Sequence, residues 1–249
     1  MGKIIHGNFN RNTSAQNRTT AIIAAGGSGS RMGLDFNKIF LSVEDKPILA
    51  YTLDVFESAK CIDNIILVHR EADKKLCEEV IREFGYKKVI AVIQGGSTRQ
   101  ESVRNGLSAV PASSDIVLIH DAARPLVTEE MLAHSIEVAK KHGAAAVGVS
   151  PVDTVKRADG DDVYETIDRN KLILIQTPQT FQKELLITAH ETARKKHQLV
   201  TDDCALLELM GKTIKIVPGS KFNIKLTTPE DYAMISAYLS CYRNEDEDD

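Results

Sequence analysis

The amino-acid sequence predicts an α/β fold, in which a Rossmann-like, mostly parallel sheet is flanked by helices and carries a protruding β-hairpin arm. Short apolar runs alternate with amphipathic stretches, which is typical of strands joined by right-handed helical crossovers. Of the 249 residues, 43% are hydrophobic but only 5% are aromatic, and Trp is absent. Ile, Leu, Val and Ala must therefore form the core, as in a sheet covered by helices on both faces.

The alternation of strands and helices is regular up to residue 150. We expect strands at 20–25, 63–69, 88–93, 115–120 and 144–150, and helices at 47–60, 71–84, 98–110 and 127–142. Parallel sheets bind ligands beyond the carboxyl ends of their strands, so residues that end these strands should lie at one edge. They are Gly26, His69, Gly95 and Asp121.

The pattern changes between residues 151 and 177. Residues 153–158 and 163–167 predict two short strands joined by a polar turn, a hairpin too small to hold a core alone. After it we expect helices at 182–195 and 201–210, a strand at 213–217 and a terminal helix from about 228. The chain should form a single domain over residues 20–241 that includes the arm at 151–177, with residues 1–19 and 243–249 disordered.

Composition bounds the functional classes. The formal net charge is −4, but the five acids at 245–249 account for it, since the rest of the chain carries +1. We expect a solvated acidic tail, with an interaction motif as the alternative. No basic run with interleaved aromatics indicates a nucleic-acid surface. Four scattered cysteines favour free thiols over zinc or disulfides. No apolar stretch approaches 18 residues, so we expect a cytoplasmic protein without a membrane partner.

A glycine-rich turn follows the first strand. Residues 24–38 read Ala-Ala-Gly-Gly-Ser-Gly-Ser-Arg-Met-Gly-Leu-Asp-Phe-Asn-Lys. The glycines let backbone N–H groups approach phosphate oxygens, and Arg31 and Lys38 add two cations nearby. The spacing matches neither a P-loop ATPase nor a dinucleotide-binding loop. The turn therefore predicts a nucleoside triphosphate site, with a plain structural turn as the alternative.

Seven later blocks sharpen this prediction. They are Gly95-Gly96-x-x-Arg99-x-x-Ser102-Val103-x-Asn105-Gly106-Leu107, His120-Asp121-Ala122-Ala123-Arg124-Pro125, Asp153-Thr154-x-Lys156, Asp168-Arg169, Gln176-Thr177-Pro178-Gln179, Thr201-Asp202-Asp203 and Asn223-Ile224-Lys225-Leu226-Thr227. With the glycine turn they resemble the nucleotidyltransferases that act on sugar or polyol phosphates, and most closely the 2-C-methyl-D-erythritol 4-phosphate cytidylyltransferases, over about residues 20–240. In one departure, Asn37 stands where that family usually has a proline, so we expect a less rigid approach to Lys38.

The resemblance implies cytidylyl transfer from CTP to 2-C-methyl-D-erythritol 4-phosphate by direct in-line attack, a step toward isoprenoid precursors. The products are 4-diphosphocytidyl-2-C-methylerythritol and pyrophosphate. The same activity on ribitol 5-phosphate and a non-catalytic nucleotide-binding module remain as alternatives. Mg²⁺ is the expected cofactor, because it takes phosphate oxygens plus one or two carboxylates. A homodimer is also implied, in which the arm embraces a second subunit and helps to complete the acceptor site.

Chemistry and resemblance together assign residues to three groups. The catalytic cations are Arg31, Lys38 and Lys225, which offset the repulsion between two anionic reactants. The CTP site comprises Ala25, Gly26, Gly27, Gly29, Gly96, Arg99, Ser102, Asp121 and Ala122, with Asp121 also the candidate metal ligand. The acceptor site comprises Arg124, Thr154, Arg169, Thr177, Thr201 and Thr227. We expect a structural His120, and a helix N-cap at Thr201 and Asp202 with a second role in the polyol pocket as the alternative. Simpler roles remain open for two other residues: a helix N-cap for Asp121, and a salt bridge to Asp168 for Arg169.

Overall fold

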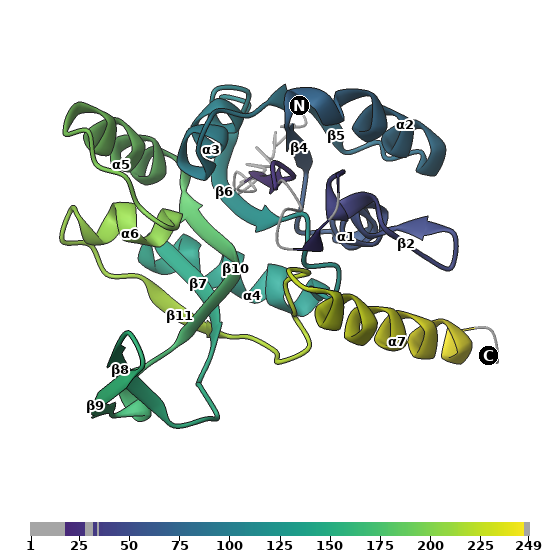
Figure 1. Cartoon of the computed structure of the whole chain (residues 1–249). Coiled ribbons are helices and arrows are strands. Elements are labelled where there is room, and N and C mark those ends of the chain that lie inside the picture. Colours follow the sequence, from purple (N-terminus) through teal and green to yellow (C-terminus); the bar gives the residue numbers. More distant parts are fainter. Residues whose placement is uncertain (1–17, 28–31, 34, 247–249) are drawn as a thin grey trace, which may run out of the picture.

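A mixed, mostly parallel sheet forms the centre of the fold (Figure 1). The computed structural model describes residues 18–27, 32–33 and 35–246, and within them the sheet has the strand order β11-β7-β10-β6-β1-β4-β5. The strands are β1 (Arg18–Ala24), β4 (Asn64–His69), β5 (Val89–Gln94), β6 (Ser114–Asp121), β7 (Ala144–Val149), β10 (Leu174–Gln182) and β11 (Lys215–Pro218). β10 runs antiparallel to both of its neighbours, and the other adjacent pairs are parallel.

Helices cover both faces of this sheet. They are α1 (Ile48–Ser58), α2 (Lys74–Phe84), α3 (Arg99–Leu107), α4 (Glu129–His142), α5 (Lys183–Lys195), α6 (Asp203–Glu208) and α7 (Pro229–Asp246). α1, α2, α4 and α7 contribute to one buried cluster, and α3, α5 and α6 contribute to the other. Ala21 and Ile23 of β1 face the first cluster and Ile22 faces the second, as the alternation of side chains along a strand requires.

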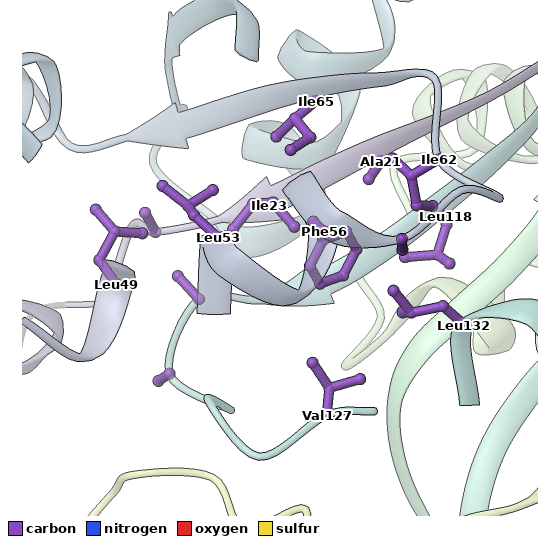
Figure 2. Close-up of a cluster of buried hydrophobic side chains, with 14 of the residues drawn as sticks. Ala21, Ile23, Leu49, Leu53, Phe56, Ile62, Ile65, Leu118, Val127 and Leu132 are labelled. Atoms are coloured by element: carbon purple, nitrogen blue, oxygen red, sulfur yellow. The ribbon is translucent and has the colours of Figure 1, made fainter. Parts of the chain in front are cut away.

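The first of these clusters fixes α1 against the sheet. Figure 2 shows Phe56 and Leu53 of α1 packed beside Ile23 and Ile65, and all four side chains are fully buried. Each such burial contributes about 1.5–3 kcal/mol. The chain that enters α1 is held in place as well, because the Ile48 N–H donates to the carbonyl of Leu41 at 2.9 Å. The segment that carries Lys38 is thereby attached to the core.

The arm, residues 151–177, contains a separate two-stranded hairpin of β8 (Val155–Asp159) and β9 (Asp162–Ile167). It projects from the body at the lower left of Figure 1. Val163 and Tyr164 on it are 60% and 62% exposed, so the hairpin has no core of its own in the single chain. Within the arm, a short 3-10 turn, η4 (Arg169–Lys171), connects this hairpin to β10 (Leu174–Gln182). The predicted hairpin is therefore confirmed as an element.

Most expected elements are present within a few residues of their predicted bounds. The structure also contains strands that the sequence does not predict, namely β10 and the small hairpin of β2 (Ser42–Val43) and β3 (Lys46–Pro47). β10 has a proline at its centre and four buried polar residues, which disguise a central strand. Its pairing with β7 shifts register between Ile175 and Gln179, around this proline.

The expected boundaries of the ordered domain need correction at both ends. Arg18 and Thr19 already belong to β1, and α7 continues to Asp246, so residues 18–19 and 243–246 are part of the fold. Residues 1–17 and 247–249 lie outside the described part of the chain. Two more 3-10 turns, η2 (Lys38–Phe40) and η3 (Glu71–Asp73), precede α1 and α2. In the described ranges no helix combines the length and the apolar character needed to cross a bilayer.

Candidate active site

A pocket of about 360 Å³ lies at the carboxyl ends of β1 and β6. Its walls come from the turn after β1, the segment before α1, the start of α3, the end of β6 and the loop before α7. The lining residues are Ala24, Ala25, Gly26, Gly27, Asn37, Lys38, Ile39, Gly96, Ser97, Thr98, Arg99, Ser102, Asp121, Ala123 and Lys225. The edge of the sheet predicted from the sequence is thus where the pocket lies. His69 and Gly95 do not line the pocket, and the Gly95 N–H donates to the His69 carbonyl at 2.8 Å.

Asp121 is the carboxylate among the pocket-lining residues, and cations surround it. Its Oδ2 lies 2.7 Å from Lys225 Nζ and 3.8 Å from Arg124 Nε, and its Oδ1 lies 3.7 Å from Arg99 Nε. Burial alone would raise the pKa of this carboxyl. The three cations, Lys225 first, outweigh burial and lower the pKa to about 2. The carboxylate is therefore ionised at neutral pH.

Lys225 reaches the pocket from the loop between β11 and α7. The Leu226 N–H donates to the carbonyl of Ala123 at 2.8 Å, which ties this loop to the segment after β6. Arg124 strengthens the same junction, because its Nη1 donates to the Asn223 carbonyl at 2.7 Å. Arg124 is nearly buried and braces this loop, and the acceptor contact expected of it stays a prediction.

A buried polar layer lies behind Asp121. The Thr177 hydroxyl accepts from the Asp121 N–H at 3.1 Å and lies 3.0 Å from His120 Nδ1. His120 Nε2 lies 3.1 Å from the Arg124 carbonyl, a group that can only accept. This fixes Nε2 as the donor and leaves Nδ1 to accept from Thr177. Burial lowers the pKa of His120 to about 4, so the ring is neutral at pH 7. His120 is structural, as expected, and the role of Thr177 toward an acceptor stays a prediction.

Arg99 connects the pocket to the helices on the opposite side. Its Nη1 donates to Asp203 Oδ2 at 2.6 Å, and His190 Nε2 lies 3.2 Å from Asp203 Oδ1. Asp203 is fully buried, yet burial does not raise its pKa overall, because His190 and Arg99 lower it. The guanidinium of Arg99 is thus held between two carboxylates, Asp121 and Asp203. The contacts of Asp203 with Arg99 and His190 could not be predicted from the sequence.

The loop between β5 and α3 is shaped by Ser102. Its hydroxyl donates to the Thr98 carbonyl at 2.8 Å and accepts from the Gly96 N–H at 3.1 Å. A Cβ on Gly96 would lie 2.5 Å from the Glu101 side chain, so this position requires glycine. Ser102 lines the pocket and retains one lone pair for a ligand, whereas its proton is committed to the loop.

The structure places the remaining predicted residues in different parts of the chain. Lys38, 6% exposed, lies in the pocket wall with Ala25, Gly26 and Gly27, and Ala122 lies next to it with its N–H donating to Ala24. Arg31 and Gly29 fall outside the described residues. Thr154 and Arg169 are exposed on the arm and do not line the pocket of their own chain. Thr227 donates to the Lys225 carbonyl at 2.9 Å. Thr201 is exposed, and Asp202 caps α6, as predicted for this segment.

One expectation about the loop is not met. Asn37, in place of a proline, was expected to leave Lys38 less rigidly held. Instead Asn37 is completely buried, and its side chain bonds to three other groups. The sequence alone gave no sign of these partners.

A glycine turn beside an ionised carboxylate and several cations, at the carboxyl edge of a Rossmann-like sheet, defines an α/β nucleotidyltransferase. The model of one family of these enzymes, 2-C-methyl-D-erythritol 4-phosphate cytidylyltransferase, matches residues 19–241. Relatives of that name from Desulforamulus reducens and Alkaliphilus oremlandii are 46% and 44% identical. The alignments cover 88% and 91% of this chain and 94% and 97% of those proteins.

Solved structures agree with the sequence comparison. The 4-diphosphocytidyl-2C-methyl-D-erythritol synthase of Anaerococcus prevotii superposes with a TM-score of 0.80 at 35% identity, over 90% of this chain and 99% of that one. The 2-C-methyl-D-erythritol 4-phosphate cytidylyltransferase of Thermus thermophilus gives 0.73 at 29% identity, over 89% and 98%. This chain belongs to the 2-C-methyl-D-erythritol 4-phosphate cytidylyltransferase family.

Proposed function

We propose that this chain transfers the cytidylyl group of CTP to 2-C-methyl-D-erythritol 4-phosphate and releases pyrophosphate. The observation that carries the proposal is the pocket in which ionised Asp121 holds Lys225 beside Lys38 and the turn after β1. Such a site accepts a triphosphate, because backbone N–H groups and cations can share its charge. The names of the relatives support the same reaction.

The reaction needs no covalent intermediate with the protein. A phosphate oxygen of the acceptor attacks the α-phosphorus of CTP, and the bond from that phosphorus to the bridging oxygen breaks as pyrophosphate leaves. Lys38 and Lys225, with Arg31, stabilise the negative charge that accumulates between the α-phosphate and the leaving group. These cations offset the repulsion between the two anionic reactants. Because the attacking phosphate oxygen is already ionised, the reaction needs no general base.

The loop between β5 and α3 is the proposed cytosine site. Backbone groups around Gly96 and the remaining lone pair of Ser102 can pair with the edge of the base, and the donor N4 of cytosine suits that acceptor. Arg99 holds the loop through Asp203 rather than contacting the base. A uracil oxygen at the same position would face an acceptor, which disfavours UTP.

Asp121 is the proposed protein ligand of Mg²⁺. No cluster of three or more His, Cys, Asp or Glu side chains suited to a metal occurs in the described part of the chain. A single ionised carboxylate still fits Mg²⁺, which takes most of its ligands from phosphates and water in nucleotide enzymes. When bound, the ion would neutralise phosphate charge beside Lys225.

The acceptor site is proposed to form in a homodimer. Thr154 and Arg169 are exposed on the arm and absent from the pocket of their own chain. The arm also exposes apolar side chains, Val152, Val163 and Tyr164 among them, which gain by burial against a second subunit. Arg169 of one subunit would then bind the acceptor phosphate at the pocket of the other, as a guanidinium fork suits a phosphate dianion.

The test is pyrophosphate release by the purified chain with CTP and a panel of polyol phosphates in the presence of Mg²⁺. We expect turnover with 2-C-methyl-D-erythritol 4-phosphate and loss of turnover when the ion is chelated. Faster release with ribitol 5-phosphate would transfer the assignment to that substrate, which the relatives do not favour. Equilibrium binding of CTP without release with any acceptor would instead indicate a non-catalytic module.

A further inference from the structure

Asn37 connects three segments at the carboxyl edge of the sheet. Its Nδ2 donates to the Ala25 carbonyl at 2.8 Å and to Asp73 Oδ2 at 2.9 Å, while its Oδ1 accepts from the Ile39 N–H at 3.4 Å. The residue is completely buried and lines the nucleotide pocket. The amide nitrogen therefore donates both of its hydrogens, one to the turn that follows β1 and one to the turn that precedes α2.

Asp73, in turn, is held by Arg70. The guanidinium donates from Nε to Asp73 Oδ2 at 2.8 Å and from Nη2 to Oδ1 at 2.9 Å, a two-bond pairing that fixes the plane of the carboxylate. The Asp73 side chain is only 6% exposed. Arg70 directly follows β4, so the chain of contacts runs from β4 through Asp73 to Asn37.

The residue placed by this chain of contacts is Lys38. The backbone of Asn37 has φ −74° and ψ 125°, and this extended residue caps the 3-10 turn that begins at Lys38. The φ lies in the range that a proline ring imposes, but here side-chain hydrogen bonds hold the conformation. Lys38 is itself 6% exposed, so its ammonium depends on where this turn puts it.

We propose that Asn37, held by Asp73 and Arg70, is a positioning residue that sets the place of Lys38 in the pocket. This inference rests on the proposed function, in which Lys38 stabilises charge in the transition state. A misplacement of about 1 Å in such a group costs on the order of 10²-fold in rate. Asn37 touches no reacting atom in this account and acts only through Lys38.

The decisive experiment is a double-mutant cycle of Asn37→Ala and Lys38→Ala. With Lys38 present, Asn37→Ala should lower kcat by about 10- to 100-fold and weaken CTP binding, measured by calorimetry, by about 3- to 10-fold. In the Lys38→Ala background the same change should alter either quantity by less than about 2-fold. A purely structural role predicts equal losses in the two backgrounds.

Stability supplies the control. Asn37→Ala should lower the midpoint of thermal unfolding equally in both backgrounds, because its hydrogen bonds to Ala25 and Asp73 do not involve Lys38. Asn64→Ala is the matched control variant. Asn64 Nδ2 of β4 donates to Thr20 Oγ1 of β1, near the amino ends of the two strands whose carboxyl ends lie near Asn37. It should reduce stability without changing kcat or CTP affinity.

The outcomes separate this inference from the proposed function. If the wild-type chain binds CTP but does not turn over, the proposed reaction is wrong, and the binding cycle still decides the role of Asn37. If turnover is present but Asn37→Ala lowers kcat as much without Lys38 as with it, the positioning role is overturned and the reaction stands. Wild-type kcat and affinity in folded Asn37→Ala would overturn it as well.

Discussion

His120 should make the protein lose stability as the pH falls from 6.5 toward 4. In the fold its ring is completely buried behind Asp121 and neutral, with a pKa lowered by that burial to about 4 from the usual 6.5. The unfolded chain therefore binds more protons between these two values. Because protons then favour the unfolded state, the free energy of unfolding falls as the pH decreases through this window.

The size of the effect follows from the two pKa values. The full difference of about 2.5 units corresponds to about 3 kcal/mol, and roughly 2 kcal/mol of it is already lost at pH 5. Asp121 and Asp203 also have lowered pKa values, but their contributions are lost only below the usual carboxyl pKa of 3.8. The interval from pH 7.5 to 5 therefore lies above the range in which these two carboxyl groups lose their contributions.

Urea unfolding at pH 7.5 and pH 5 measures this difference. His120→Gln removes the titrating ring but keeps an N–H that can donate to the Arg124 carbonyl, so this variant should lose about 2 kcal/mol less than the wild type between the two pH values. His142→Gln, at an exposed position in the last turn of α4, is the matched control and should follow the wild type. An equal loss in wild type and His120→Gln would refute the assignment of a buried neutral ring.

Three predictions concern the site itself. Lys225→Ala should lower kcat by about 10²-fold or more, the scale of one lost charge-stabilising donor, whereas exposed Lys221→Ala should not; wild-type pyrophosphate release by the first variant would contradict its role. CTP should exceed UTP in kcat/KM by about 10-fold or more, because reversing one buried donor leaves two acceptors facing each other; equal values would remove the cytosine assignment. Arg169→Ala should raise KM for the polyol phosphate by about 10-fold or more, with little change in KM for CTP. Mixing the Arg169→Ala and Lys38→Ala variants should restore activity, because one site of the heterodimer then has both residues intact. A fully active monomer would exclude a shared site.

The strand and helix pattern of this chain could be predicted because it depends on local periodicity. Ala21, Ile22 and Ile23 alternate between two buried clusters, and an apolar run of this kind is visible in the sequence. β10 could not be predicted in the same way. The four residues that flank its central proline, at 176, 177, 179 and 180, are polar but buried. Partners distant in sequence satisfy them, such as Asn223 on the Thr177 carbonyl and Ser135 on the Thr180 hydroxyl. A strand stabilised by such pairs resembles a loop in the sequence.

The same distinction between local pattern and distant partners applies to the residues of the candidate site. Asp121, Lys38 and the glycines were visible because each stands at the end of a strand or in a recognisable motif. The groups that orient them were not, because Asn37–Asp73 and Arg99–Asp203 are pairs separated by 36 and 104 residues. Each partner taken alone is an ordinary polar residue. Only the fold brings the amide of Asn37 to Asp73 and the guanidinium of Arg99 to Asp203.

The position of Asp121 explains why a site built to bind anions contains a buried carboxylate. Without it, Lys225, Arg99 and Arg124 would lie close together and repel one another, and of the three only Arg99 would keep a carboxylate partner, Asp203. Asp121 offsets that repulsion before substrate arrives, and the lowered pKa of its carboxyl measures how strongly the cations favour its ionised form. It also holds Lys225 at 2.7 Å, in a fixed direction at the pocket wall. A cation ordered in advance needs little reorganisation when charge develops on the phosphates, and this preorganisation is the contribution that we expect the buried carboxylate to make to the reaction.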